Sequence, residues 1–280
     1  MNSRPRAIQN IITSALYECP HVSTVEPLGS LLSGSDDEYS DIDLRVHVTA
    51  LPEAIASRHE LLSAVGSLAV EWTVHLRPDS FCSSLLFAEE SCYHRADLEF
   101  CSTEHVSEDE LLKAALSCNP QDALYVPAPG EPGHFLVGQL LGGTRYAKAR
   151  RRGQHLACWR FFSAMVDWYC ALLYEQSQDW PELNRKLNTE EYLALDGIID
   201  AATVHRIHAA LDLSRADKMD SGVLFLLDSI VELAVRKADS AGRPIPDAPI
   251  SHLSDFLRSE LGQRNNVQQG VEGDAANRAP

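Results

Sequence analysis

The spacing of apolar residues predicts that the first hundred residues mix helices and strands. Over residues 4–19 the apolar side chains recur every three or four positions, which is the spacing of one helical face. Residues 41–48 instead alternate polar and apolar side chains, as a half-buried strand does. The same criteria predict a helix over 52–65 and strands over 21–28, 68–76, 81–88 and 93–101, the last two forming a hairpin. We therefore expect an α+β fold with a small, mixed, twisted sheet and flanking helices.

The second half of the chain has an almost entirely helical pattern. Residues 119–133 are dense in proline and glycine, so we place a linker at 121–133, after a first domain at 1–120. Beyond it, apolar residues recur at helical spacing and predict a helical bundle over 134–262. The tail at 263–280 is polar and poor in apolar residues, which predicts disorder.

Composition narrows the function classes. The 24 basic and 40 acidic residues give a net charge of −16, which argues against a grip on long nucleic acid and favours a cationic ligand or a metal. The sequence has no run of about 20 apolar residues and no secretory signal pattern, so we expect no membrane association and a cytoplasmic protein. The seven cysteines form no Cys-x-x-Cys pair, so we interpret them as reduced, buried apolar side chains.

The candidate chemistry lies in an acidic segment. Between Glu26 and Asp43 there are six acidic residues and no basic one, and a divalent cation would relieve their repulsion. Asp41 and Asp43 stand two apart on a predicted strand, so both side chains leave the same face. Paired carboxylates suit Mg²⁺, and two such ions clamp a triphosphate during transfer. The common alternative is that such acids form a solvated outer face, and we expect the loop at 36–38 to be solvated.

A third carboxylate lies on a later predicted strand. Asp97 and Glu99 share one face of that strand, while Leu98 points to the other. If this strand lies beside the one that carries Asp41 and Asp43, Asp97 completes the metal site and can accept the proton of an attacking hydroxyl. Glu99 competes for both roles, and the sequence leaves this choice open.

Gly29 and Ser30 precede the acidic pair by one loop. A glycine at the end of a strand lets the backbone approach a phosphate closely, and the N–H groups that follow and the Ser30 hydroxyl can donate to it. Such a pair is common in ordinary turns, so its value comes from its place just ahead of Asp41 and Asp43.

The residues from Gly29-Ser30 to Asp41-Ile42-Asp43 resemble the polymerase-β-like nucleotidyltransferase superfamily. Its pattern is Gly-Ser, a loop, Asp-x-Asp and an acidic residue on a later strand, for which Asp97 is the match. The string over residues 37–44 is similar to the antibiotic-modifying branch, which includes aminoglycoside and lincosamide nucleotidyltransferases. The resemblance covers about residues 20–101 and implies a nucleotidyltransferase-type sheet domain followed by a helical domain that helps to bind the acceptor.

The resemblance also implies a reaction. A hydroxyl of a small acceptor, cationic if it is an aminoglycoside, attacks the α-phosphorus of ATP or another nucleoside triphosphate, and pyrophosphate leaves. Asp41, Asp43 and Asp97 would hold Mg²⁺, as two ions in the family's manner, and antibiotic resistance would be the biological role. Two alternatives remain: a toxin-type enzyme that modifies a protein side chain, and a degenerate nucleotide-binding scaffold. The sequence does not indicate the oligomeric state.

One departure from the family pattern concerns the phosphates. A basic residue often follows Gly-Ser in the family, whereas this chain has Leu31-Leu32. The basic stretch at 145–152 is a candidate replacement, and Arg145, Lys148 and Arg152 would share one helical face. We therefore expect Gly29, Ser30, Arg145 and Lys148 to contact the nucleotide. The alternative is a solvated basic face paired with the acidic domain.

Overall fold

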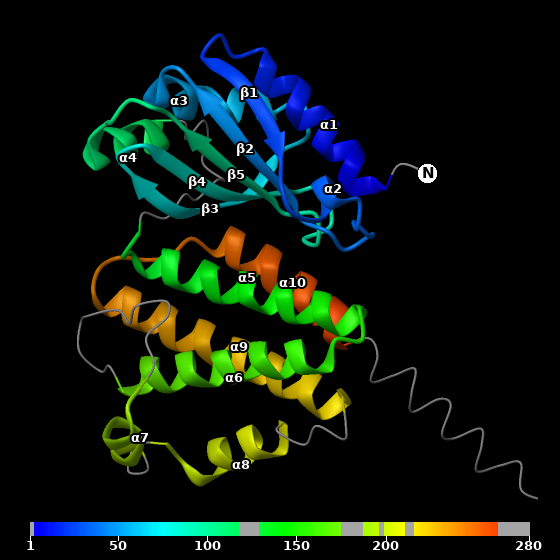
Figure 1. Ribbon diagram of the computed structural model, residues 1–280. Helices are drawn as coiled ribbons and strands as arrows, with labels where there is room; N and C mark the ends of the chain where they lie inside the picture. The colour runs from blue at the N-terminus through cyan, green and yellow to red at the C-terminus, as the bar shows by residue number, and fades with distance from the viewer. Residues whose placement is uncertain (1–2, 118–128, 175–186, 196–198, 211–215, 263–280) are drawn as a thin grey trace, which may run out of the picture. The chain divides into compact units, whose positions relative to one another are not determined.

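The computed structural model describes residues 3–117, 129–174, 187–195, 199–210 and 216–262 (Figure 1). The chain divides into two compact units, residues 1–134 and residues 135–280. The first contains a five-stranded mixed sheet with helices, and the described part of the second is helical, which confirms the expected α+β class. The tail predicted at 263–280 and most of the linker predicted at 121–133 lie outside the described residues.

The sheet of the first unit has the strand order β1-β2-β5-β4-β3. Strands β2 and β5 run parallel and the other neighbours run antiparallel, so the expected pairing of residues 81–88 with 93–101 is confirmed. The elements of this unit are α1 (Arg4–Tyr17), β1 (Val22–Pro27), α2 (Gly29–Ser33), β2 (Ile42–Val48), α3 (Leu51–Leu62), β3 (Leu68–Arg77), β4 (Ser80–Phe87), β5 (Ala96–Cys101) and α4 (Glu108–Ser117).

The two faces of the sheet differ in their side chains. Helices α1, α3 and α4 lie against one face, where alternate strand residues such as Leu44, Leu98 and Phe81 form the core (Figure 1). On β2 and β5 the residues between them point to the opposite face, where they are partly exposed and include Asp43 and Asp97; we call this the polar face. The alternation read from the sequence therefore decides which residues can form a site.

The helix-covered face also contains a fully buried ionic cluster. Glu71 on β3 accepts two hydrogen bonds from Arg58, each 2.8 Å long, and lies 2.5 Å from His59 Nε2. Arg58 also donates to the carbonyls of Ile55 and Ala115. Burial opposes ionisation of Glu71, but the charge of Arg58 and the bond with His59 prevail and lower its pKa from 4.5 to about 2. The hydrogen bonds of this cluster connect α3, β3 and α4.

The second unit is built from α5 (Pro132–Arg151), which begins in the first unit, and from α6 (His155–Tyr174), α7 (Thr189–Leu195), α8 (Ala201–Ala210), α9 (Ala216–Ser240) and α10 (Asp247–Gly262). Small residues on α5 allow close packing. A Cβ added at Gly143 would lie 2.9 Å from side-chain atoms of both Leu227 on α9 and Leu257 on α10. Helices α5, α9 and α10 therefore meet around this glycine.

Helix α6 is long and apolar enough to cross a membrane by length and composition, and it is the one such helix among the described residues. A core helix of a soluble protein satisfies the same criteria, so this is weak evidence. Its buried residues include Phe162 and Met165, and it packs against α9 within the helical unit.

The cysteines of the described residues are free, as expected. Most are buried, and only Cys101 is partly exposed. Burial raises the pKa of Cys92 to about 12, and burial together with the nearby charges of Asp97 and Glu99 raises the pKa of Cys82 to about 12. Cys118 lies outside the described residues.

Candidate active site

The parallel pairing of β2 and β5 brings the three candidate aspartates together. Asp43 and Asp97 are register partners on the polar face, and Asp41 stands just before β2 begins. The backbone N–H of Ile42 donates to the carbonyl of Arg95 over 2.8 Å, which aligns the starts of the two strands. The condition set from the sequence, that the two strands be neighbours, is therefore met. The roles of the three residues stay a prediction.

Arg95 connects two of these carboxylates. Its Nε donates to Asp97 Oδ1 over 2.9 Å, and its Nη2 donates to Asp97 Oδ2 over 2.7 Å and to Asp41 Oδ2 over 3.4 Å. The residue is only 5% exposed. Burial alone would lower the pKa of Arg95, but attraction to Asp97 and Asp41 raises it, so the guanidinium is held in its charged form. The sequence does not predict this role of Arg95, because the alternating pattern places Asp97 on a face but gives no sign that a neighbouring side chain turns toward it.

Glu99, the competing third carboxylate, has another partner. It is the register partner of Arg45, whose Nε and Nη2 donate to Glu99 Oε2 over 2.9 and 2.8 Å. Glu99 thus lies one step farther along the polar face, next to Arg45 rather than Asp43. This register favours Asp97 over Glu99 as the third carboxylate of the site.

The backbone at Gly29 lies close to the carboxylate of Asp43. The N–H of Leu28 donates to the carbonyl of Asp43 over 2.8 Å, and a Cβ added at Gly29 would lie 2.5 Å from Asp43 Oδ2. Gly29 also has a φ of 58°, in the left-handed region that favours glycine. The sequence predicted the end of a strand followed by a loop here, whereas Gly29 and Ser30 begin the short helix α2, whose C-cap Gly34 has a φ of 72°. Gly29 lies beside Asp43, as the pattern required.

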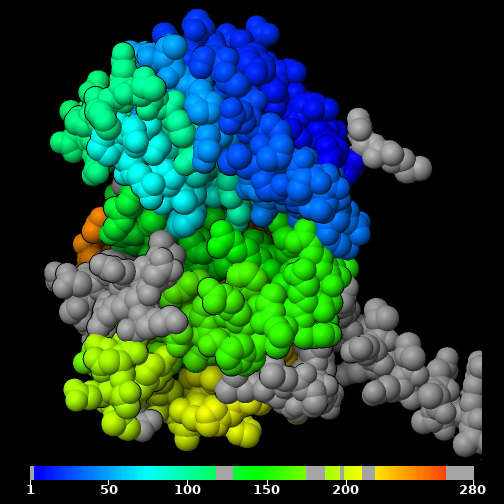
Figure 2. All heavy atoms as spheres, viewed as in Figure 1, coloured from blue at the N-terminus to red at the C-terminus, as the bar shows by residue number. Residues whose placement is uncertain are grey.

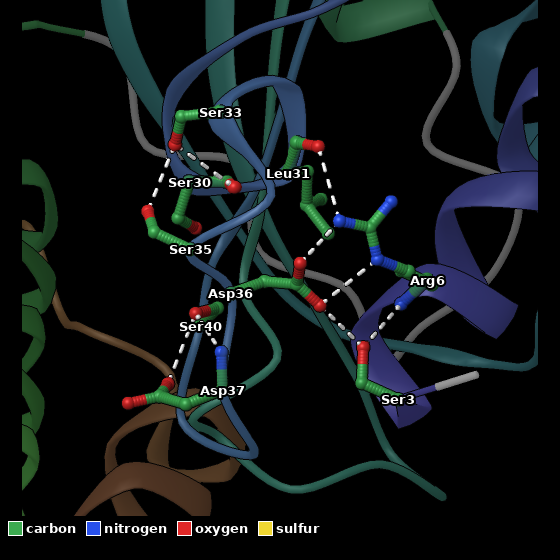
Figure 3. A network of polar contacts seen from close by, with 9 residues as sticks. All are labelled: Ser3, Arg6, Ser30, Leu31, Ser33, Ser35, Asp36, Asp37 and Ser40. Carbon is green, nitrogen blue, oxygen red and sulfur yellow. Dashed lines mark hydrogen bonds and ion pairs between the residues drawn. The ribbon is translucent and has the colours of Figure 1, made fainter. Parts of the chain in front are cut away.

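The loop after α2 is fixed by a polar network (Figure 3). Asp36 accepts from the Ser3 hydroxyl over 2.6 Å and pairs with the guanidinium of Arg6, which also donates to the carbonyl of Leu31. These bonds, with Arg6 the largest cause, lower the pKa of Asp36. Figure 2 shows α1, in dark blue, adjoining this loop, in a lighter blue, on the surface.

The expectation of a solvated loop at 36–38 is wrong for Asp36, whose side chain is 6% exposed. Asp37 is also engaged, because its carboxylate accepts from the Ser40 hydroxyl over 3.0 Å (Figure 3). The sequence shows only that the loop lacks local basic partners; the partner comes from α1, thirty residues away. The network holds the segment that leads from α2 to Asp41.

A second loop, between β4 and β5, is anchored in the same way. Arg4 pairs with Glu90, and this bond, against the opposing effect of burial, is the main reason that the pKa of Glu90 is lowered. His94 Nε2 lies 3.0 Å from the carbonyl oxygen of Glu38, which joins the two loops. The start of α1 and both loops therefore hold the chain on either side of the aspartates.

The polar face continues past Asp97 to an aromatic side chain. Ser84 on β4 is the register partner of both Asp97 and Trp72, and its hydroxyl donates to Asp97 Oδ1 over 2.5 Å. Trp72 on β3 stacks on His134 with ring centroids 5.0 Å apart and donates from Nε1 to the His134 carbonyl. Asp43, Asp97, Ser84 and Trp72 thus form one row across four strands.

The basic residues proposed to meet the phosphates lie on α5. Arg145 is exposed, whereas Lys148 is buried, with 8% exposure. Two neighbours in the same stretch are engaged within the helical unit, since Arg150 pairs with Asp220 and Arg151 with Glu260. The alternative of one solvated basic face paired with the acidic domain is therefore wrong for Arg150 and Arg151. Contact of Arg145 and Lys148 with the nucleotide stays a prediction.

The carboxylates suit a divalent cation in chemistry but are not yet arranged around one. Within the described ranges, no three His, Cys, Asp or Glu side chains are disposed to hold a metal ion. Arg95 lies among these carboxylates and donates to oxygens of Asp41 and Asp97. Carboxylate oxygens are nonetheless the ligands that Mg²⁺ prefers, and Gly29 lets the backbone approach Asp43 more closely than a residue with a Cβ could. The residues present therefore fit the ion.

Comparison with known proteins leaves the function to be inferred from this geometry. The sequence matches no protein-family model and no curated protein. Among solved structures, the chain is similar to the crystal structure of an aminoglycoside 6-adenyltransferase from Bacillus subtilis, with 12% identity and a TM-score of 0.33, over 92% of this chain and 99% of that one. A TM-score this low supports no conclusion about activity or residues.

Proposed function

We propose that the chain is a magnesium-dependent nucleotidyltransferase that transfers a nucleoside monophosphate, AMP in the first instance, from a triphosphate to a hydroxyl of a small acceptor. The observation that carries the proposal is the register of β2 and β5, which sets Asp97 beside Asp43 with Asp41 one step before the strand. Gly29 against Asp43 adds the close backbone approach that a triphosphate needs.

The chain's own residues divide the chemistry as follows. Asp41, Asp43 and Asp97 would hold Mg²⁺, which supplies positive charge against the triphosphate and the leaving pyrophosphate. The acceptor oxygen forms a bond to the α-phosphorus as the bond to the pyrophosphate oxygen breaks. The hydroxyl proton passes to a carboxylate, for which Asp97 is the candidate because it lies on the same face as Asp43. Gly29 and Ser30 would contact the phosphates.

The acceptor we favour is an aminoglycoside or aminocyclitol, with a lincosamide as the second class. The chain carries a net charge of −16, and aminoglycosides are polycations, so the long-range field attracts them. A lincosamide carries less positive charge and gains less from this field.

The second candidate function is a nucleotide-binding scaffold without turnover. The observation that favours it is Arg95, which already pairs with both Asp41 and Asp97. A scaffold would keep this arrangement and bind nucleotide without releasing pyrophosphate.

The test is pyrophosphate release from the full chain with Mg²⁺, each of the four nucleoside triphosphates and a panel of aminoglycosides and lincosamides. We expect release with one acceptor class and a labelled acceptor when the α-phosphate is radioactive. Asp43→Asn should lower the rate about 10³-fold or more. Its matched control is Glu26→Gln, which changes an exposed acid on the neighbouring strand and should retain the rate.

Three other results would contradict the proposal in different ways. Label on a protein instead of the small acceptor would identify the toxin-type enzyme. Nucleotide binding without turnover for every acceptor would identify the scaffold. Equal rates for Asp43→Asn and the unmodified chain would remove Asp43 from the site.

A further inference from the structure

The polar face of the sheet holds more negative than positive charge around Arg95. Asp41, Asp43, Asp97 and Arg95 together place one guanidinium among three carboxylates. The side chain of Arg95 is 6% exposed, whereas those of Asp41 and Asp97 are 25% and 23% exposed. The positive charge is therefore the most deeply placed member, and the carboxylates around it are partly open to solvent.

The bonds of Arg95 use the atoms that a metal ion would need. Both oxygens of Asp97 and Oδ2 of Asp41 accept from it at 2.7 to 3.4 Å. A carboxylate oxygen that accepts from a guanidinium keeps a second lone pair, but a divalent cation at that oxygen would lie close to the guanidinium, and the two positive charges would repel each other. Arg95 and a metal at these oxygens therefore compete for the carboxylates in this arrangement.

A guanidinium released from these oxygens would have an anionic partner nearby in the loaded protein. Arg95 stays protonated at any working pH, and its planar fork suits phosphate oxygens as well as carboxylates. The chain lacks a basic residue directly after Gly29-Ser30, where Leu31 and Leu32 stand instead. Arg95 is a cation in the same group of side chains as Asp43, against which Gly29 packs.

We propose that Arg95 is an exchangeable counter-ion: it holds Asp41 and Asp97 together without metal, yields them to a divalent cation, and then pairs with the nucleotide phosphates. This inference rests on the proposed function. Arg95 is thus a positioning residue for the metal ligands and a binding residue for the nucleotide. Metal and nucleotide should then bind cooperatively, because each stabilises the arrangement that the other requires.

The experiment compares Arg95→Met with Arg45→Met in the full chain. Both changes replace a guanidinium on the polar face by a neutral side chain of similar length, but Arg45 pairs with Glu99 instead of the aspartates. Mn²⁺ binding without nucleotide is measured by calorimetry, and ATP binding is measured separately at saturating metal. Thermal unfolding is followed with EDTA and with Mg²⁺.

We expect Arg95→Met to bind Mn²⁺ about tenfold more tightly than the unmodified chain, because no guanidinium repels the ion, and ATP about tenfold more weakly, because its phosphates lose a partner. In EDTA its unfolding temperature should fall, and Mg²⁺ should restore it by a larger shift than in the unmodified chain. Arg45→Met should change neither affinity by more than about threefold, because solvent and salt screen the general loss of charge. If Arg95 had a purely structural role, its substitution would not tighten metal binding and weaken ATP binding at the same time.

The results separate failure of this inference from failure of the proposed function. Metal affinity in Arg95→Met equal to or weaker than that of the unmodified chain would overturn the exchange, while turnover by the unmodified chain would keep the function. Absence of metal binding by every variant, with and without ATP, would overturn both. If Arg95→Met does not fold, Arg95→Lys decides, because a point charge cannot bridge both carboxylates and should also raise metal affinity.

Discussion

Two clusters of charged side chains occupy opposite faces of one sheet. Glu71 projects from β3 to the helix-covered face, where its side chain and that of Arg58 have no exposed surface. Asp43 and Asp97 project from β2 and β5 to the other face, where the carboxylate of Asp97 keeps about a quarter of its surface exposed.

The two clusters differ in charge balance. Glu71 is a single carboxylate that accepts from Arg58 through both oxygens and also contacts His59. On the polar face, three aspartates surround one guanidinium, and all of them lie within short chain distances of exposed loops. A buried acid with every oxygen satisfied is costly to disturb, because removing any partner leaves an unpaired charge in the core. Surplus acid on a partly open face indicates binding of a cation instead.

The largest expected effect is the loss of activity on substitution of Asp97, on the polar face. We expect Asp97→Asn to lower nucleotidyl transfer about 10²- to 10⁴-fold, because it removes a ligand charge and the candidate proton acceptor. Its unfolding temperature should stay the same or rise, since one of three like charges is gone. The measurement is the initial rate of pyrophosphate release, with thermal unfolding on the same samples.

Glu99→Gln is the matched control for Asp97→Asn. It stands two residues along the same strand face and is paired with Arg45, so the rate should stay within about fivefold of the unmodified chain. A larger loss for Glu99→Gln than for Asp97→Asn would move the third carboxylate to Glu99.

Substitutions in the helix-covered cluster should instead lower the stability of the first unit. Glu71→Gln leaves Arg58 buried without its counter-charge, and we expect the first unit to lose about 3–5 kcal/mol of stability. Hydrogen exchange of amides in α3 and β3 measures this loss within the unit. Unchanged protection of those amides would mean that the cluster contributes little, and the contrast between the two faces would fail.

The pH dependence of stability provides a further test of the helix-covered cluster. The pKa of Glu71 is lowered from 4.5 to about 2, so the folded chain keeps this carboxylate ionised where the unfolded chain has begun to bind a proton. Its contribution is therefore present above pH 4.5 and is lost as the pH falls toward 2; it amounts to about 3 kcal/mol. Denaturant unfolding at several pH values should show this loss, and Glu71→Gln should show a flatter dependence over the same range.

The sequence predicted the strands that form the polar face better than the ion pairs and hydrogen bonds between the side chains on it. Alternation along residues 41–48 correctly put Asp43 on the face opposite Leu44, and alternation along residues 93–101 correctly put Asp97 on the face opposite Leu98, because burial of the two leucines leaves no other orientation. The pairing of β2 with β5 was only a condition, since alternation does not specify which strands become neighbours.

The side chains that hold the aspartates could not be predicted from local pattern. Arg6 reaches Asp36 across thirty residues, and Arg4 reaches Glu90 across a longer separation still. Arg95 stands two residues from Asp97, but its guanidinium also meets Asp41 because β2 and β5 are parallel neighbours. Such contacts depend on the tertiary fold, so an acidic loop without local basic residues looks solvated until its distant partner is known.

Gly29 offers the finest test of the polar face, because a single methyl group distinguishes backbone strain from contact with Asp43. In Gly29→Ala the new Cβ would lie 2.5 Å from Asp43 Oδ2, and in Gly34→Ala nothing lies within 4 Å of it. Both glycines have positive φ, at 58° and 72°, so each substitution should cost about 1 kcal/mol of stability. Only Gly29→Ala should displace Asp43, which we expect to lower turnover about 10²-fold. Rates and urea unfolding of the two variants side by side check this; equal rates would show that the approach of Gly29 to Asp43 serves the fold alone.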